Sequence, residues 1–210
     1  MNVFVDNDII LKLAACNLFS EAITSFEFKQ SNLRVLSNAK YVFRGRGKVK
    51  QQYPSAIRDR AIAIVETCRT IQANLSDELA ILLQVEAIDE GEAILISATC
   101  QQNYFYLVTG DKRCLEALAR NDEIREIHQS LQGKCICLEQ IILNLIYTQG
   151  FEKISEKVLP ARQYDTALRS IFGSGEEATQ DNVLQSLQGY INDLQNKSNG
   201  LLVDLDRISC

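Results

Sequence analysis

Carboxylates follow apolar segments at several well-separated points of this 210-residue chain. The acids in these positions are Asp6, Asp8, Glu92 and Asp111. Taken singly, most of them are better explained as helix caps or first-turn acids than as functional groups. Asp6 is different, because it directly follows an apolar run and an unpaired carboxylate there costs several kcal/mol of desolvation. Carboxylates gathered in one place repel one another, and a hard divalent cation relieves that repulsion, so the pattern predicts a metal site.

The elements that must position these acids alternate between strands and helices. Strands are predicted at 3–5, 33–36, 104–108 and 135–138. Helical spacing of apolar residues recurs at 10–18 (weakly to 26), 57–68, 79–87, 93–98, 115–119 and 139–149, with a short helix at 38–43. This alternation indicates an α/β fold with three α/β/α layers around a mainly parallel sheet. Because every strand-to-helix turn of such a sheet lies along one edge, the acids should meet there.

Size and composition favour one core with an appendage. The chain has 46% hydrophobic and 23% charged residues and is long enough to bury a sizeable core. Residues 1–150 are predicted to form the α/β domain, and 151–210 a helical extension that packs on this core or on a partner. Seven cysteines without a C-x-x-C pair favour reduced thiols. Since no apolar run approaches the ~20 residues of a membrane span, we expect a soluble cytoplasmic protein with no membrane partner.

Three segments carry a family resemblance. In chain order, "VFVDNDIILKLA", "DEGEAILISAT" and "FYLVTGDKRCLEAL" resemble the acidic motifs of the PIN-domain nucleases, which include the toxin ribonucleases of toxin–antitoxin pairs. The resemblance covers about residues 1–140. It implies a PIN-like fold and a ribonuclease that uses Mg²⁺ or Mn²⁺ to hydrolyse phosphodiester bonds. It also implies an antitoxin protein as a partner.

The resemblance assigns roles to the acids residue by residue. The implied catalytic residues are Asp6, Glu92 and Asp111, and these three with Asp8 are the implied metal ligands. The family usually has another acid on a helix in the middle of the domain, and no position here matches it clearly. Glu66 is the best candidate for this middle acid, followed by Glu27.

Basic residues supply candidate phosphate contacts, although the net charge of −5 argues against a protein that coats polyanions. Segment 44–54, "RGRGKVKQQYP", is expected to be a mobile basic loop. The candidate nucleic-acid-binding residues are Arg44, Arg46, Lys48, Lys50, Lys112 and Arg113. They would hold the phosphate backbone of a nucleic acid, with RNA favoured over DNA, and the affinity would fall as the salt concentration rises. A solvated segment without a ligand is the competing interpretation, and the single histidine, His128, is predicted to be a solvated surface residue.

Two alternatives stay open. "FVDNDII" also resembles the apolar-D-x-D signature of haloacid-dehalogenase-like phosphatases, with Asp6 as nucleophile and Asp8 as general acid/base, although Ile9 and Ile10 stand where glycine and threonine are usual. The second alternative is a catalytically inactive PIN-like module that binds nucleic acid or a partner protein. Its amphipathic segment 183–194 would pack on the core, form a homodimer or receive an antitoxin.

Overall fold

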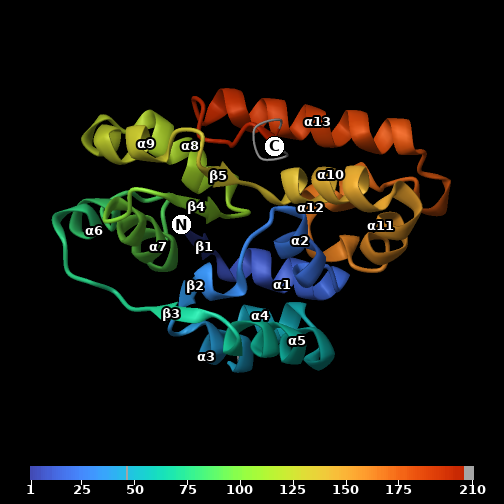
Figure 1. Cartoon of the computed structure of the whole chain (residues 1–210), viewed down its shortest axis with the longest axis horizontal. Helices are drawn as coiled ribbons and strands as arrows, with labels where there is room; N and C mark the ends of the chain where they lie inside the picture. The colour runs from blue at the N-terminus through green and yellow to red at the C-terminus, as the bar shows by residue number, and fades with distance from the viewer. Residues whose placement is uncertain (46, 206–210) are drawn as a thin grey trace.

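A central parallel sheet organises the chain (Figure 1). The computed structural model describes residues 1–45 and 47–205. Its five strands lie in the order β3-β2-β1-β4-β5, and every neighbouring pair is parallel. The strands are β1 Asn2–Val5, β2 Leu33–Leu36, β3 Arg69–Ile71, β4 Phe105–Val108 and β5 Cys135–Ile136. The prediction of an α/β fold with a parallel central sheet is therefore confirmed.

Helices connect and cover the strands. The first group is α1 Asn7–Cys16, α2 Phe19–Ser25, α3 Ala39–Arg44, α4 Lys48–Gln52, α5 Ser55–Glu66, α6 Asp77–Leu82 and α7 Glu90–Cys100. The second group is α8 Lys112–Arg120, α9 Arg125–Leu131, α10 Leu138–Gln149, α11 Phe151–Val158, α12 Thr166–Ile171 and α13 Gln180–Lys197. Within the described residues, no helix has the length and apolar character needed to cross a bilayer.

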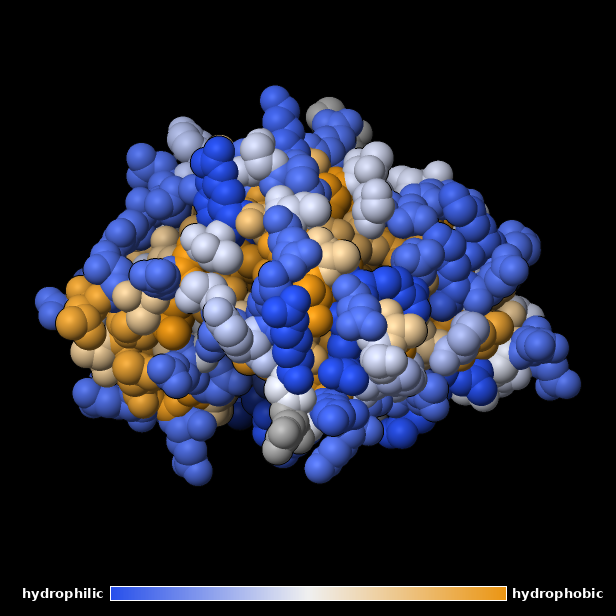
Figure 2. All heavy atoms as spheres, turned by 90° about the horizontal axis from the view of Figure 1, so that it is seen from below, coloured by the Kyte–Doolittle hydropathy of each residue, from blue (hydrophilic) through white to orange (hydrophobic). Residues whose placement is uncertain are grey.

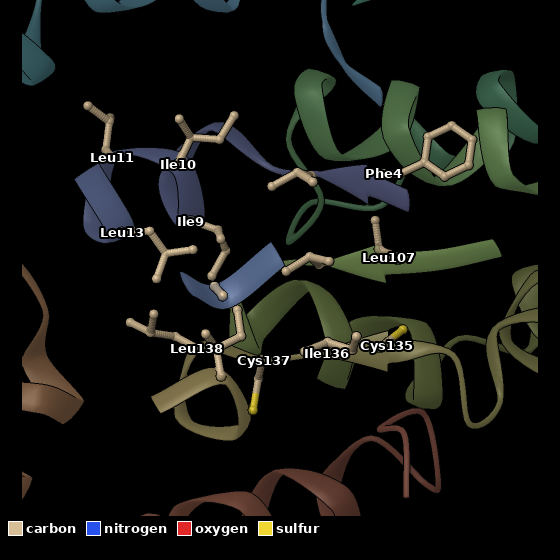
Figure 3. Close-up of a cluster of buried hydrophobic side chains, with 14 of the residues drawn as sticks. Phe4, Ile9, Ile10, Leu11, Leu13, Leu107, Cys135, Ile136, Cys137 and Leu138 are labelled. Carbon is tan, nitrogen blue, oxygen red and sulfur yellow. The ribbon is translucent and has the colours of Figure 1, made fainter. Parts of the chain in front are cut away.

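The two faces of the sheet are covered by different helices. On one face Val5 and Val108 lie against apolar side chains of α1, α2 and α10. On the other face Leu107 lies against side chains of α7 and α8. Figure 3 shows buried side chains of β1, α1, β4 and β5 gathered around the middle of the sheet. Each fully buried Leu or Ile contributes about 1.5–3 kcal/mol, so this core fixes the strand ends that carry the acids.

The C-terminal extension continues the sheet as well as packing on it. Cys135 N donates to Leu201 O at 2.9 Å, and Val203 N donates to Cys135 O at 2.8 Å. A parallel bridge between Cys135 and Leu202 lies between these bonds. Helix α13 packs on α10 (Figure 1). The final described residues therefore cover the outer edge of β5.

Local structure differs from the sequence prediction at several points. The helix predicted over 79–87 ends at Leu82, as α6. Residues 48–52 of the predicted basic loop form α4, because Val49 packs on the core and accepts a 2.9 Å hydrogen bond from the buried Tyr53 N. The helix predicted from 10 towards 26 is two helices, since Asn17 takes a left-handed conformation with φ of 51°. Strand β3 has no apolar run and was not predicted. Arg46 of the predicted loop lies outside the described residues.

The prediction for His128 is wrong. Its side chain is buried, with 6% exposure, on α9. Nε2 lies 3.0 Å from Ser198 O, a carbonyl at the end of α13. The C-terminal extension therefore covers this histidine. The polar sequence around His128 gives no sign of that contact, which depends on where the extension packs. His128 does not line the cavity that holds the acids.

Candidate active site

The four acids singled out from the sequence line one cavity of about 450 Å³ at the carboxyl edge of the sheet. Asp6 and Asp8 come from the end of β1 and the start of α1, Glu92 from the first turn of α7, and Asp111 from the turn between β4 and α8. Asp89, directly before α7, joins them. The parallel topology brings these separate turns together, as the sequence predicted.

Asp6 is the acid most constrained by the sheet. Its N–H donates to Val108 O at 2.9 Å, so the residue continues the pairing of β1 with β4. Only 9% of Asp6 is exposed. The pKa of its carboxyl is raised to about 7, mainly by burial and further by the charges of Asp8 and Asp89. The backbone hydrogen bond from Asn7 and the charge of Lys12 oppose this rise. Near neutral pH this carboxyl therefore holds its proton for part of the time.

Glu92 is held by its own helix. Its carboxylate Oε2 accepts from Asp89 N at 2.8 Å, and Asp89 Oδ1 accepts from Glu92 N at 2.8 Å, which completes a capping box at the start of α7. Burial raises the pKa of Glu92 to about 8, opposed by the bond from Asp89 N and assisted by the charges of Asp111, Asp89 and Asp6. The cap fixes the side chain, yet its charge stays unfavourable.

Asp111 caps α8. Its Oδ1 accepts from Arg113 N at 2.8 Å and from Cys114 N at 3.1 Å, and Thr109 Oγ1 accepts from Asp111 N at 3.2 Å. Its Oδ2 has a 3.4 Å contact with the guanidinium of Arg113, whose side chain is 86% exposed. One carboxylate oxygen is thus used by the helix, while the other has only a weak, solvated partner.

Asp8 belongs to a chain of ion pairs. Lys12 Nζ lies 2.5 Å from Asp8 Oδ2 and 2.7 Å from Asp165 Oδ2. Burial lowers the pKa of Lys12, but the two carboxylates outweigh it and the net shift is upward. Gly110 makes room for this pair, because a Cβ there would lie 2.9 Å from Asp8 Oδ2. The Asp8–Lys12 spacing of i, i+4 was readable from the sequence, whereas the pairing with Asp165 was not.

The candidate phosphate-binding residues fall into two groups. Helix α4 borders the cavity through Val49 and Gln52, and the exposed Lys48 and Lys50 lie on that helix. Arg44, also exposed, ends α3, and the face of the molecule that carries α3, α4 and α5 is mostly hydrophilic (Figure 2).

Lys112 is differently placed. Its Nζ lies 2.5 Å from Glu139 Oε1 and 4.5 Å from the centre of the Tyr190 ring. Its charge therefore joins α8 to α10 and α13. Arg113, the next residue, remains exposed beside Asp111.

The candidate middle acids lie elsewhere. Glu66 ends α5, is half exposed and pairs with Lys40, and it does not line the cavity. Glu27 is exposed in the turn after α2, with φ of 55°. Beside the four predicted metal ligands, the cavity is lined by other polar side chains, which include Asn7, Asn38, Tyr53, Asp89 and Glu90.

The donor set can be compared with what a cation requires. As placed, no three Asp, Glu, His or Cys side chains in 1–45 and 47–205 form a group able to hold a metal ion. Glu92 and Asp111 each use one carboxylate oxygen to accept a hydrogen bond from a backbone N–H at the start of a helix. The chemistry of the donors nevertheless fits a hard cation. Asn7 Oδ1 is buried in the described structure without a hydrogen-bond partner, and Asn7 lines the cavity with the acids. Binding a cation would require the capping carboxylates to share their oxygens.

Comparison with protein-family models, with curated proteins and with solved structures finds no match to this chain.

Proposed function

We propose that this chain is a PIN-like, metal-dependent nuclease that hydrolyses phosphodiester bonds, and RNA is favoured over DNA as its substrate. One observation carries the proposal: Asp6 and Glu92 are buried in one cavity with their pKa values raised to about 7 and 8, and neither has an ion pair with a basic side chain among the described residues. Perturbed acids that converge in a cleft are typical of functional sites.

Mg²⁺ or Mn²⁺ would be held by oxygens of Asp6, Asp8, Glu92 and Asp111. A bound divalent cation lowers the pKa of water and neutralises charge on the phosphate. The carboxyls of Asp6 and Glu92 are partly protonated near neutral pH, and these protons must leave before the carboxylates can act as ligands. Cation affinity should therefore rise with pH between about pH 6 and pH 8.

The phosphate backbone of the substrate would be held by the exposed cations beside the cavity. Lys48 and Lys50 extend from α4, which borders the cavity, and Arg113 follows Asp111. Lys112 is already paired with the buried Glu139, so it is a weaker candidate for this role.

A catalytically inactive binding module is the second candidate. It is favoured by the use of Glu92 and Asp111 as helix caps and by the position of Glu66 outside the cavity. Such a module would bind RNA through the same cations without cleaving it. For the phosphatase alternative, Asp8 would have only Oδ1 left for acid/base chemistry, because Oδ2 is paired with Lys12.

The test compares the wild-type chain with Asp6→Asn and, as a matched control, Asp193→Asn on labelled RNA and single-stranded DNA, with and without Mn²⁺. Asp193 is an exposed residue of α13 paired with Lys197, so its substitution changes the net charge equally. Mn²⁺-dependent cleavage that is lost only in Asp6→Asn supports the proposal. Equal cleavage by all three proteins contradicts it. Tight RNA binding without cleavage assigns the chain to the inactive module.

A further inference from the structure

The C-terminal extension reaches the acids through one residue. Asp165 Oδ2 lies 2.7 Å from Lys12 Nζ, and the same ammonium lies 2.5 Å from Asp8 Oδ2. The side chains of Lys12 and Asp165 are 11% and 12% exposed, whereas that of Asp8, on the cavity side, is 43% exposed. Because little water screens the inner pair, a change of charge at Asp165 is felt at Asp8.

Other contacts hold Asp165 in this position. Its Oδ1 accepts from Leu168 N at 2.8 Å and so caps α12, which carries it. The preceding residue, Tyr164, stacks on Tyr53 with ring centres 4.8 Å apart and an angle of 24°. Tyr53 lines the acidic cavity. The extension therefore supports Tyr53, a residue of the cavity wall, and contacts Lys12, the ion-pair partner of Asp8.

We propose that Asp165 is a positioning residue that sets the negative charge available at Asp8 by sharing the ammonium of Lys12. This inference rests on the proposed function, since the cation to be held is the one proposed for the nuclease. Without Asp165, the positive charge of Lys12 neutralises Asp8 alone, so less negative charge remains at Asp8 and the cavity attracts a cation less strongly. Without the charge of Lys12, Asp8 and Asp165 are both unneutralised, and the cavity attracts a cation more.

Mn²⁺ binding to the full chain tests the proposal, measured by titration calorimetry at about pH 8 so that proton competition is small. We expect Asp165→Asn to bind Mn²⁺ about tenfold more weakly than the wild type. Lys12→Gln should bind it more tightly, and Asp193→Asn should match the wild type. Asparagine can keep the cap on α12, but it removes one partner of the buried Lys12, so the melting temperature of Asp165→Asn should fall. Binding is therefore compared at a temperature where circular dichroism shows every variant to be folded.

Opposite effects of two substitutions in one ion-pair chain separate a charge effect from a loss of structure. Weaker binding in both Asp165→Asn and Lys12→Gln would indicate a structural role and overturn the inference. Equal binding by Asp165→Asn, Asp193→Asn and the wild type would overturn it too, and would leave the proposed nuclease intact. If the wild type binds no Mn²⁺, the proposed metal site fails and this inference fails with it. Should circular dichroism show that Lys12→Gln does not fold, Asp165→Glu, which keeps the negative charge, takes its place. Binding closer to that of the wild type than Asp165→Asn shows supports the charge effect, and binding as weak as that of Asp165→Asn overturns it.

Discussion

Two sets of acids near one edge of the sheet are neutralised to different extents. Asp8, Glu139 and Asp165 each lie within 2.7 Å of a lysine Nζ. Asp6 and Glu92 are buried, yet neither forms an ion pair with a basic side chain within the part of the chain described. We call these the paired acids and the unpaired acids.

The difference appears in the pKa values. Burial raises the pKa of Asp165, but Lys12 outweighs it and the net shift is downward. For Asp6 and Glu92, burial and neighbouring carboxylates raise the pKa, and the opposing hydrogen bonds are insufficient. An acid that serves only the fold is stabilised by a cationic partner. Leaving Asp6 and Glu92 without one reduces stability and leaves the repulsion among these carboxylates for a cation to relieve, which favours these two as the functional pair.

The largest effects are expected from Asp6→Asn. Removal of a metal ligand should lower Mn²⁺-dependent cleavage by at least about a hundredfold. The neutral amide resembles the protonated form that burial favours, so the free energy of unfolding at about pH 8 should rise by about 2–4 kcal/mol. Single-turnover cleavage and urea unfolding measure the two changes.

A loss of both activity and stability in Asp6→Asn would contradict this comparison, because it would give Asp6 the behaviour expected of a paired acid. The control is Glu116→Gln. Glu116 pairs with the exposed Arg120 on α8, so its substitution should change stability by less than about 0.5 kcal/mol and leave cleavage unchanged.

The paired acids should respond differently. Lys112→Met leaves the Glu139 carboxylate buried, at 4% side-chain exposure, without its cation. Stability should fall by about 3 kcal/mol, because breaking a buried pair from one side leaves an uncompensated charge. Glu139→Gln should cost less, since Lys112 is 33% exposed and water can solvate it. Urea unfolding measures the loss of stability in both variants. Equal losses would show that the buried Glu139 carboxylate carries no larger penalty than Lys112 when its partner is removed.

The sequence was sufficient to predict the part of the site that depends on topology. Strands with continuous apolar runs, such as β1 and β4, were recognisable, and a parallel sheet then requires the turns after them to share one edge. That is why Asp6, Glu92 and Asp111 could be brought together without coordinates. Strand β3 was not recognisable because its residues, Arg69–Ile71, are largely exposed at the edge of the sheet.

What the sequence could not provide is the partner of each charge. The contacts of Asp165 with Lys12 and of Ser198 with His128 depend on where the extension docks, and no periodicity encodes a contact between such distant residues. The same holds for the helix α4 in the basic segment, where the partly buried Val49 and the buried Tyr53 pack against the rest of the molecule. Tertiary packing here overrides the loop signal of the flanking glycines.

The unpaired acids also predict a pH dependence of stability. Because the folded pKa values of Asp6 and Glu92 lie above those of the unfolded chain, the folded state binds more protons between about pH 4 and pH 8. Their contribution to stability is therefore complete below about pH 4 and is lost as pH rises towards 8. We expect a loss of about 4 kcal/mol or more across this window, from which the share of Asp6 is missing in Asp6→Asn. Unfolding in urea at several pH values measures it, and stability that rises steadily to pH 8 would contradict the unpaired assignment.

The smallest expected effects concern the exposed lysines of α4, the helix that borders the cavity of the unpaired acids. Lys48 and Lys50 form no ion pair among the described residues, so their charges are free for phosphate. Alanine at either position should weaken RNA binding severalfold and lower the slope of log affinity against log salt by about 0.7. The matched control is Lys153→Ala, an exposed lysine of α11 bonded to Gln149. Fluorescence anisotropy at several salt concentrations measures the slopes. A slope reduced equally by all three substitutions would mean that RNA responds to net charge alone, and that α4 does not direct the phosphate backbone to the acids.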